Sequence, residues 1–158
     1  YPLAKRFTKW PQIILGLTFS WAVPTAWSSA NEEWNLGILF MYLATVFWII
    51  GYDTIYGCQD KNEDEIFDIK NSAVSAKNFL TLFVGCSYSL MFCLLIISGY
   101  LLNNNIFWYI GVSICGLHLA NQVRKIKNIE QNNPLQIFKS NIVLGLFLTL
   151  SSLGNHIS

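Results

Sequence analysis

Long stretches of the sequence carry no charged side chain. They cover residues 10–31, 34–52, 78–123 and 140–158, and the charged residues fall outside them. The hydrocarbon core of a bilayer is about 30 Å thick, and a helix needs about 20 residues to cross it. Each stretch is close to that length or longer, and 78–123 is long enough for two crossings. The sequence therefore predicts membrane-spanning helices.

The longest uncharged stretch has a natural break. Asn103, Asn104 and Asn105 stand together near its middle, and asparagine favours turns and caps over helix interiors. The chain is thus predicted to be an all-α polytopic transmembrane helical bundle, a single membrane domain over residues 1–158. Its spans are expected at about 12–30, 34–52, 79–101, 106–123 and 140–156, with an acidic loop at 53–77. The runs lack the alternation of a transmembrane β-barrel.

A soluble helical bundle with an apolar core is the alternative to a membrane protein. Charged residues make up 12% of this chain, whereas soluble domains carry about 25%. This shortage of charge favours the membrane protein. The hydrophobic share of 53% excludes an intrinsically disordered chain, and a net charge of +1 argues against a nucleic-acid partner.

Basic residues mark one side of the predicted bundle. With five spans, the N-terminus, the 53–77 loop and the 124–139 loop lie on the same side of the bilayer. Every lysine and arginine falls there: Lys5, Arg6, Lys9, Lys61, Lys70, Lys77, Arg124, Lys125, Lys127 and Lys139. The positive-inside rule predicts that this side is cytoplasmic.

Proline, cysteine and histidine add smaller predictions. Pro24 is expected to kink the first span, because proline lacks the N–H of a regular helix. The four cysteines form no CxxC pair and are interpreted as reduced apolar residues. His118 is expected to be neutral and hydrogen-bonded between helices, although ionisable groups inside a membrane are often functional.

The acidic loop carries the pattern that indicates chemistry. If the second helix continues into it, Asp53, Tyr56, Asp60 and Asp64 stand at i, i+3, i+7 and i+11 on one face. Asp60 and Asp64 would repel each other, one turn apart, unless a cation lay between them. Mg²⁺ binds one or two carboxylates together with water and phosphate oxygens. The pattern therefore favours a metal or diphosphate site.

Two other interpretations of the loop compete with that site. A calcium-binding EF-hand needs Gly at its sixth position and Glu at its twelfth, where the sequence has Glu65 and Asn71, so we reject it. A solvated connecting loop stays open as the alternative. Against it stands Asp53, which directly follows an uncharged span at the membrane surface.

The loop also resembles a known family. Tyr52-Asp53-Thr54, Tyr56, Gln59-Asp60-Lys61 and Asp64 together are similar to the second aspartate-rich motif of the UbiA superfamily of intramembrane prenyltransferases. The opening segment 1–12, Leu15-Gly16 with Phe19-Ser20-Trp21, and the tail segment 138–145 resemble its 4-hydroxybenzoate polyprenyltransferase branch. The resemblance covers essentially the whole chain.

The resemblance implies a fold of about nine spans, of which this chain supplies the last five, and an enzymatic reaction. Mg²⁺ between two aspartate-rich loops would bind the diphosphate of a polyprenyl diphosphate. Diphosphate would leave, and the ring of 4-hydroxybenzoate would attack the allylic cation beside its hydroxyl group, a step towards ubiquinone. Mg²⁺ and basic side chains would stabilise the leaving charge, and the apolar bundle would exclude water.

The resemblance also assigns expected roles to individual residues. Asp60 and Asp64 are the expected metal-binding and catalytic pair. Arg6 is the third expected catalytic residue, because it matches a basic position that binds the acceptor carboxylate or the diphosphate. Asp53, Tyr56, Lys61 and Lys70 are the expected substrate-binding residues. For Arg6 and Lys61 the alternative is a role in membrane topology alone.

Three departures from the family bear on these expectations. Asp68 stands where the family has Gly, and Asn71 where it has Ser. The first motif, N-D-x-x-D-x-x-x-D, is absent from the sequence. We therefore expect the C-terminal portion of such an enzyme, which needs the missing N-terminal spans and lies in a bacterial inner membrane, or in the mitochondrial inner membrane of a eukaryote.

Three other functions remain as alternatives. The departures also fit a non-catalytic truncated membrane protein, or a UbiA-type prenyltransferase with a different aromatic acceptor. A transporter is the third alternative. It would need ionisable groups inside its spans, where this sequence has only histidine.

Overall fold

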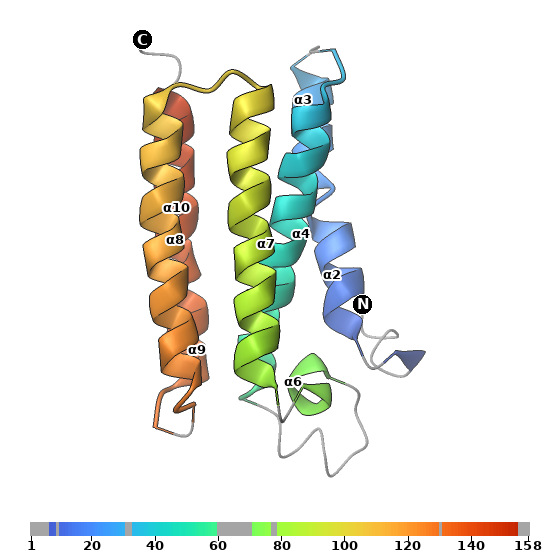
Figure 1. Ribbon diagram of the computed structural model, residues 1–158. Helices are drawn as coiled ribbons and strands as arrows, with labels where there is room; N and C mark the ends of the chain where they lie inside the picture. The colour runs from blue at the N-terminus through green and yellow to red at the C-terminus, as the bar shows by residue number, and fades with distance from the viewer. Residues whose placement is uncertain are drawn as a thin grey trace.

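The structure, a computed structural model, describes residues 7–8, 10–30, 33–59, 71–76, 79–129 and 131–154, and contains no strand within them. Figure 1 shows the arrangement of the helices. They are α2 (Pro11–Phe19), α3 (Ala22–Ser29), α4 (Leu36–Gly57), α6 (Ser72–Ser75), α7 (Leu80–Leu101), α8 (Ile106–Ile126), α9 (Pro134–Lys139) and α10 (Asn141–Leu153). The predicted all-α fold class is confirmed.

Four helical segments are long and apolar enough to cross a membrane. They are α4, α7, α8 and the segment Pro134–Leu153, which consists of α9 followed by α10. Large apolar side chains cover the outside of these segments, with Leu117 75% exposed and Ile142 68% exposed. Such surfaces are stable in lipid and costly in water. The chain is an integral membrane protein.

The first predicted span, 12–30, is not one continuous helix. It consists of α2 and α3, which are separated at Ser20 and Trp21. Pro24 has no N–H to donate to the carbonyl of Ser20, and the backbone N–H of Val23 donates to that carbonyl instead, at 3.0 Å. Since the residues at the break keep right-handed helical angles, the result is a kink, as Pro24 predicts.

Asparagine side chains begin four of the helices. Asn35, Asn71, Asn105 and Asn133 each accept a hydrogen bond from the backbone N–H two residues later, at 2.7 to 3.0 Å. The predicted break in the longest uncharged stretch is confirmed. Asn103 has a left-handed φ of 54°, and the N–H of Asn104 donates to the carbonyl of Gly99, which closes the end of α7.

The connections between helices alternate between the two ends of the bundle. Figure 1 shows α6 and the α8–α9 turn at one end, and the α3–α4 and α7–α8 connections at the other. The last turn of α8, with Arg124 and Lys125, and α9, with Lys139, belong to the same end as α6. The prediction that all basic residues lie on one side of the membrane requires this alternation of the connections.

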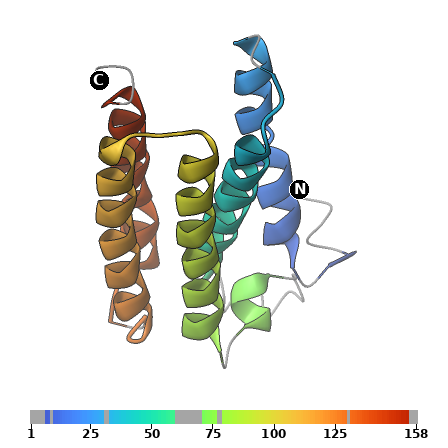
Figure 2. The same cartoon turned by 45° about the horizontal axis from the view of Figure 1, so that its top comes forward.

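Helix α4 lies at the centre of the packing. It packs most closely on α7 and also contacts α2, α3 and α9, while α8 packs on α7 and α10. Figure 2, like Figure 1, shows α7 and α8 in front of α4 and α10. The close approach of α4 and α7 needs Gly51, because a Cβ there would lie 2.3 Å from the ring of Tyr88.

Candidate functional site

The two predicted site residues that the structure describes lie at the end of α4. Asp53 is half-buried, and Tyr56, one turn later, is 37% exposed. The predicted residues Arg6, Asp60, Lys61, Asp64 and Lys70 lie outside the described residues. Asp53 and Tyr56 thus lie at the base of the site, where the chain enters the acidic loop from α4, and α6 follows that loop.

The second helix does not continue into the acidic loop as far as Asp60, so the condition for one helical face from Asp53 to Asp64 is not met. Helix α4 ends at Gly57, and Cys58 and Gln59 form a turn and a bend. The carbonyl of Gly57 accepts a hydrogen bond from the Asn71 side chain, at 3.0 Å. Because this bond satisfies one of the free carbonyls at a helix end, it stabilises the end of α4 at that point. Asp53 and Tyr56 lie within α4, whereas Asp60 and Asp64 come after its end and lie outside the described residues.

A cluster of buried polar side chains joins the two ends of the acidic loop. We call Gln12, Thr54, Asn71 and Ser72 the loop-base cluster; each is at most 2% exposed. The hydroxyls of Thr54 and Ser72 are 2.7 Å apart. The amide of Gln12 donates to the side-chain oxygen of Asn71, at 2.9 Å, and its oxygen accepts from the backbone N–H of Ser72, at 3.1 Å.

The loop-base cluster holds three elements together. Gln12 belongs to α2, Thr54 to α4, and Asn71 and Ser72 to the start of α6. Buried polar groups that are all hydrogen-bonded fix one arrangement, because leaving any of them unpaired is costly. Gly57 adds to this fit, since a Cβ there would lie 2.5 Å from the Asn71 side chain.

Sequence reasoning missed the loop-base cluster. The sequence patterns mark Asn71 as a mismatch to an EF-hand and a departure from the family, and Gln12 as part of a resemblance, and neither predicts a buried hydrogen bond. The signal in the sequence is an uncharged polar residue in the first turn of an apolar helix, which needs a partner when it is buried. The partner of Gln12 is Asn71, which is 59 residues later in the sequence, so local spacing does not reveal the pair.

Aromatic rings form a continuous surface beside Asp53. The ring of Phe138, in α9, lies 5.5 Å from Tyr52 and 4.9 Å from Tyr56, measured between ring centres. The ring of Trp48 continues the surface, 5.7 Å from Tyr52. Its indole N–H donates to Asn141, at 2.9 Å, which ties α4 to the start of α10. We call Trp48, Tyr52, Tyr56 and Phe138 the aromatic surface.

A second polar network connects α7, α8 and the junction of α9 with α10. The Tyr88 hydroxyl donates to the side chain of Gln122, at 2.7 Å. Gln122 and His118 each lie within hydrogen-bonding distance of the Ser140 hydroxyl, at 2.9 and 3.1 Å. The prediction that His118 is hydrogen-bonded between helices is confirmed.

The metal prediction rests on residues beyond this base. Among the residues that the structure describes, no group of three or more His, Cys, Asp or Glu side chains could hold a metal ion. Asp60 and Asp64 lie outside these residues. The four cysteines, all of them among the described residues, form no disulfide, which agrees with their interpretation as reduced residues.

Comparison with known proteins relates the whole chain to one family. Residues 1–150 match the model of the UbiA prenyltransferase family. No solved structure matches the chain. The family match covers α2 to most of α10, and so includes the loop-base cluster and the aromatic surface.

Three curated relatives illustrate the similarity. The chain is 35% identical to the mitochondrial 4-hydroxybenzoate polyprenyltransferase of Dictyostelium discoideum, an alignment that covers 95% of this chain and 33% of the relative. It is 34% identical to the 4-hydroxybenzoate octaprenyltransferase of Francisella tularensis subspecies novicida, and that alignment covers 99% of this chain and 55% of the relative. It is 32% identical to the 4-hydroxybenzoate octaprenyltransferase of Salmonella paratyphi B, and that alignment covers 95% of this chain and 52% of the relative. The chain spans one third to about half of their length.

Proposed function

This chain belongs to the UbiA prenyltransferase family, and from that premise we propose that it forms part of a 4-hydroxybenzoate polyprenyltransferase of ubiquinone biosynthesis. The enzyme transfers a polyprenyl group from its diphosphate to the ring of 4-hydroxybenzoate. The names of the three relatives support this acceptor. The complete site requires further N-terminal spans that carry the first aspartate-rich motif.

The observation that supports the proposal is that both ends of the acidic loop lie at the end of α4 that carries the aromatic surface. The loop-base cluster fixes both ends of the loop at the last turns of α4. Asp53 and Tyr56 lie on those turns, and Tyr56 contacts Phe138. The carboxylate of Asp53 and rings suited to an apolar chain thus lie at one end of the bundle, where the chain enters the acidic loop.

The donor chemistry of the loop fits Mg²⁺. At the loop base, half-buried Asp53 offers a carboxylate, and the loop sequence adds the carboxylates of Asp60 and Asp64. Magnesium prefers oxygen ligands and retains sites for phosphate oxygens. Asp60 and Asp64 would hold the ion, which would supply Lewis-acid stabilisation of the departing diphosphate.

Basic and aromatic side chains of the chain bind the substrates and exclude water. Lys61 and Lys70 bind the diphosphate, and Arg6 binds the diphosphate or the acceptor carboxylate, because guanidinium and ammonium groups pair with such anions. The aromatic surface excludes water from the allylic cation, and aromatic faces attract cations. Tyr52 and Tyr56, on the last turns of α4 with Asp53, both contact the ring of Phe138 in α9.

The proposed location follows from the basic residues. The end of the bundle with α6 and α9 faces the cytoplasm, or the equivalent compartment of a mitochondrion. The membrane is the inner membrane of a bacterium, or the mitochondrial inner membrane in a eukaryote. This orientation gives the acidic loop access to water-soluble 4-hydroxybenzoate.

A chimera tests the proposed reaction. This chain replaces the matching segment of the Francisella relative, and prenylated 4-hydroxybenzoate is measured in isolated membranes. Asp60→Asn and Asp64→Asn are each expected to lower the rate by about 100-fold or more, because each removes a carboxylate that would hold the Mg²⁺ ion needed to stabilise the departing diphosphate. Glu63→Gln, in the same loop but outside the motif, is the matched control and is expected to remain active.

Protein levels separate loss of chemistry from loss of insertion. All three variants are expected to reach the membrane in equal amounts, since they alter residues outside the spans. If Asp60→Asn and Asp64→Asn both retain the activity of Glu63→Gln, the proposed metal pair is wrong. If the unmodified chimera prenylates a different aromatic acceptor and not 4-hydroxybenzoate, the acceptor is wrong and the prenyltransferase assignment stands.

A further inference from the structure

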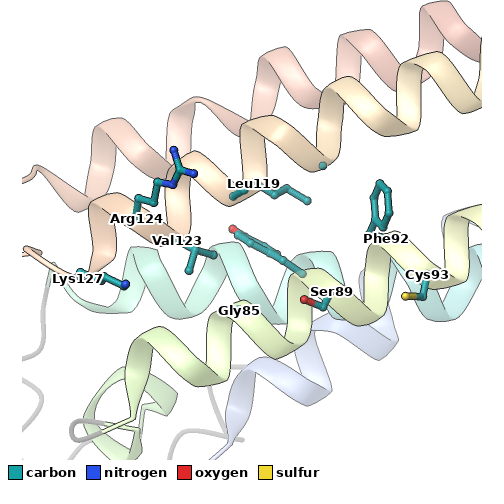
Figure 3. Close-up of a pocket in the computed structure, with 11 residues that line it drawn as sticks. Gly85, Ser89, Phe92, Cys93, Leu119, Val123, Arg124 and Lys127 are labelled. Atoms are coloured by element: carbon teal, nitrogen blue, oxygen red, sulfur yellow. The ribbon is translucent and has the colours of Figure 1, made fainter.

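A groove runs between α7 and α8, separate from the aromatic surface. It has a volume of about 620 Å³, and Figure 3 shows the side chains that line it. Small residues form much of its floor, namely Gly85 and Ser89 on α7 and Gly116 and Ala120 on α8. No described residue of α4, α9 or α10 lines it. We call it the α7–α8 groove.

A second hollow adjoins the α7–α8 groove over the outer side of α7. It has a volume of about 820 Å³, and its own lining includes Leu82, Cys86 and Leu90. Both hollows share Gly85, Ser89, Cys93 and Val123. Because the two hollows touch along one small-residue strip, a ligand with two apolar chains can occupy both.

The charge of the α7–α8 groove is concentrated at one end. Arg124 lies in the last turn of α8, Lys127 follows that helix directly, and both side chains are exposed. Figure 3 shows the two cations at one end of the groove, with Phe92 and Cys93 at the other. The hydroxyl of Tyr88, which also lines the groove, is already donated to Gln122.

The length of the groove corresponds to one leaflet of a bilayer. Gly116 and Lys127 are 11 residues apart, which at the rise of an α-helix is about 16 Å. Half of the hydrocarbon core is about 15 Å thick. The charged end lies where α8 leaves the apolar stretch, at the level of lipid headgroups, and the uncharged end lies near the middle of the bilayer.

We propose that the α7–α8 groove and the adjoining hollow bind an anionic phospholipid. One acyl chain lies in each hollow, and the headgroup phosphate lies between Arg124 and Lys127. The argument is charge complementarity, since a negative headgroup meets two cations at the membrane surface, and basic residues there attract anionic lipids. Two hollows match the two acyl chains of a phospholipid, whereas a polyprenyl diphosphate has one chain.

Native mass spectrometry of the purified chain tests the assignment. The probe is an equimolar mixture of phosphatidylglycerol and phosphatidylcholine with the same acyl chains. The unaltered chain is expected to retain phosphatidylglycerol preferentially. Removing both cations, by Arg124→Gln with Lys127→Gln, is expected to lower that preference by about 25-fold, or about fivefold for each cation.

A charge-matched variant distinguishes the groove from general attraction. Lys125→Gln with Lys139→Gln removes the same charge at the same end of the bundle. Lys125 lines a small polar pocket against α9 instead, and Lys139 lies in α9. This variant is expected to retain phosphatidylglycerol as the unaltered chain does. If the two double variants lose it equally, the groove site is wrong.

A bulky substitution that fills the groove tests whether an acyl chain lies in it, without changing the charge of the protein. Ala120 is exposed and lines the groove, so Ala120→Trp is expected to block it and to lower phosphatidylglycerol retention. The control is Leu117→Trp, on the same helix but outside the groove lining. Equal melting temperatures of the two variants exclude misfolding as the cause, and unchanged retention in Ala120→Trp overturns the proposal.

The prenyl substrate is the remaining alternative occupant. Geranylgeranyl diphosphate, added in excess, is expected to leave the phosphatidylglycerol adduct unchanged. If it displaces phosphatidylglycerol, and if Ala120→Trp abolishes its own binding, the groove belongs to the substrate and the phospholipid assignment is wrong. Lipid retention is measured without any prenyl transfer, so this result is independent of the proposed reaction.

Discussion

Asn71 connects three parts of the chain through a single side chain. Its amide N–H₂ donates to the carbonyl of Gly57, and its oxygen accepts from Gln12 and from the N–H of Ala73. The residue therefore ends α4, begins α6 and holds α2. A substitution that looks like a departure from a family motif thus has a structural role in this chain.

Replacement of Asn71 by alanine is expected to destabilise the protein strongly. Each buried group left without a partner costs about 1–3 kcal/mol, and Asn71→Ala leaves several. Asn71→Ser keeps the cap of α6 and is expected to cost less. The measurement is thermal denaturation in detergent micelles, followed by circular dichroism.

The control for Asn71 is another asparagine that begins a helix. Asn133 caps α9 and is exposed, so Asn133→Ala loses a cap alone, worth about 1 kcal/mol. If Asn71→Ala lowers the melting temperature no more than Asn133→Ala does, the loop-base cluster contributes little to stability. Burial separates the two caps, because Asn71 is 1% exposed and Asn133 is exposed.

The predictability of the site differs from residue to residue. The helical spacing of Asp53 and Tyr56 indicated their common face, because a period of 3.6 residues is a local property. The contacts of Tyr52 and Tyr56 with Phe138 join α4 to α9 and follow from tertiary packing. No local pattern encodes such pairs, so the aromatic surface could not be predicted.

At the scale of the elements, the spans were predictable because lipid excludes charge. The predicted spans 79–101 and 106–123 correspond to α7 (Leu80–Leu101) and α8 (Ile106–Ile126). The last span is predicted to begin at residue 140, six residues after the helical segment begins at Pro134, because α9 precedes α10 and Lys139 ends α9. The charge of Lys139 marked a boundary in the sequence, whereas in the structure the helical segment continues past it.

The turn between α7 and α8 depends on the backbone angle of Asn103. A left-handed φ costs an L-residue about 1 kcal/mol or more, glycine almost nothing and asparagine little. Asn103→Ala is therefore expected to destabilise the protein by about 1 kcal/mol, and Asn103→Gly to leave it equal or slightly more stable. Chemical denaturation in micelles measures both.

A neighbouring asparagine is the control for this turn. Asn103 is the non-glycine residue with a positive φ in the described part of the chain, so Asn104→Ala lacks the backbone penalty. Equal destabilisation by Asn103→Ala and Asn104→Ala would contradict the assigned role of the left-handed angle.

At the scale of the whole molecule, the arrangement predicts accessibility from opposite sides of the membrane. Glu33 lies between α3 and α4, and Asn128 lies between α8 and α9, at opposite ends of the bundle; both are exposed. In a background without the four native cysteines, Glu33→Cys is expected to react with a membrane-impermeant thiol reagent in intact cells. Asn128→Cys is expected to react only after the membrane is opened.

The opposite labelling pattern would invert the proposed orientation. Labelling of both positions from one side would contradict the number of crossings between them, which the structure places at three through α4, α7 and α8. The number of crossings and the sidedness of the basic residues are thus tested by the same pair of variants.

Gln12 also has a consequence for the order in which the chain is made. Its partner Asn71 is 59 residues later in the sequence. Ribosomes add about 5–20 residues per second, so α2 exists for about 3 to 12 seconds before that partner emerges. During this interval the Gln12 amide has to be hydrated or held by the insertion machinery. Lateral release of α2 into lipid is therefore expected to wait until α6 has been synthesised.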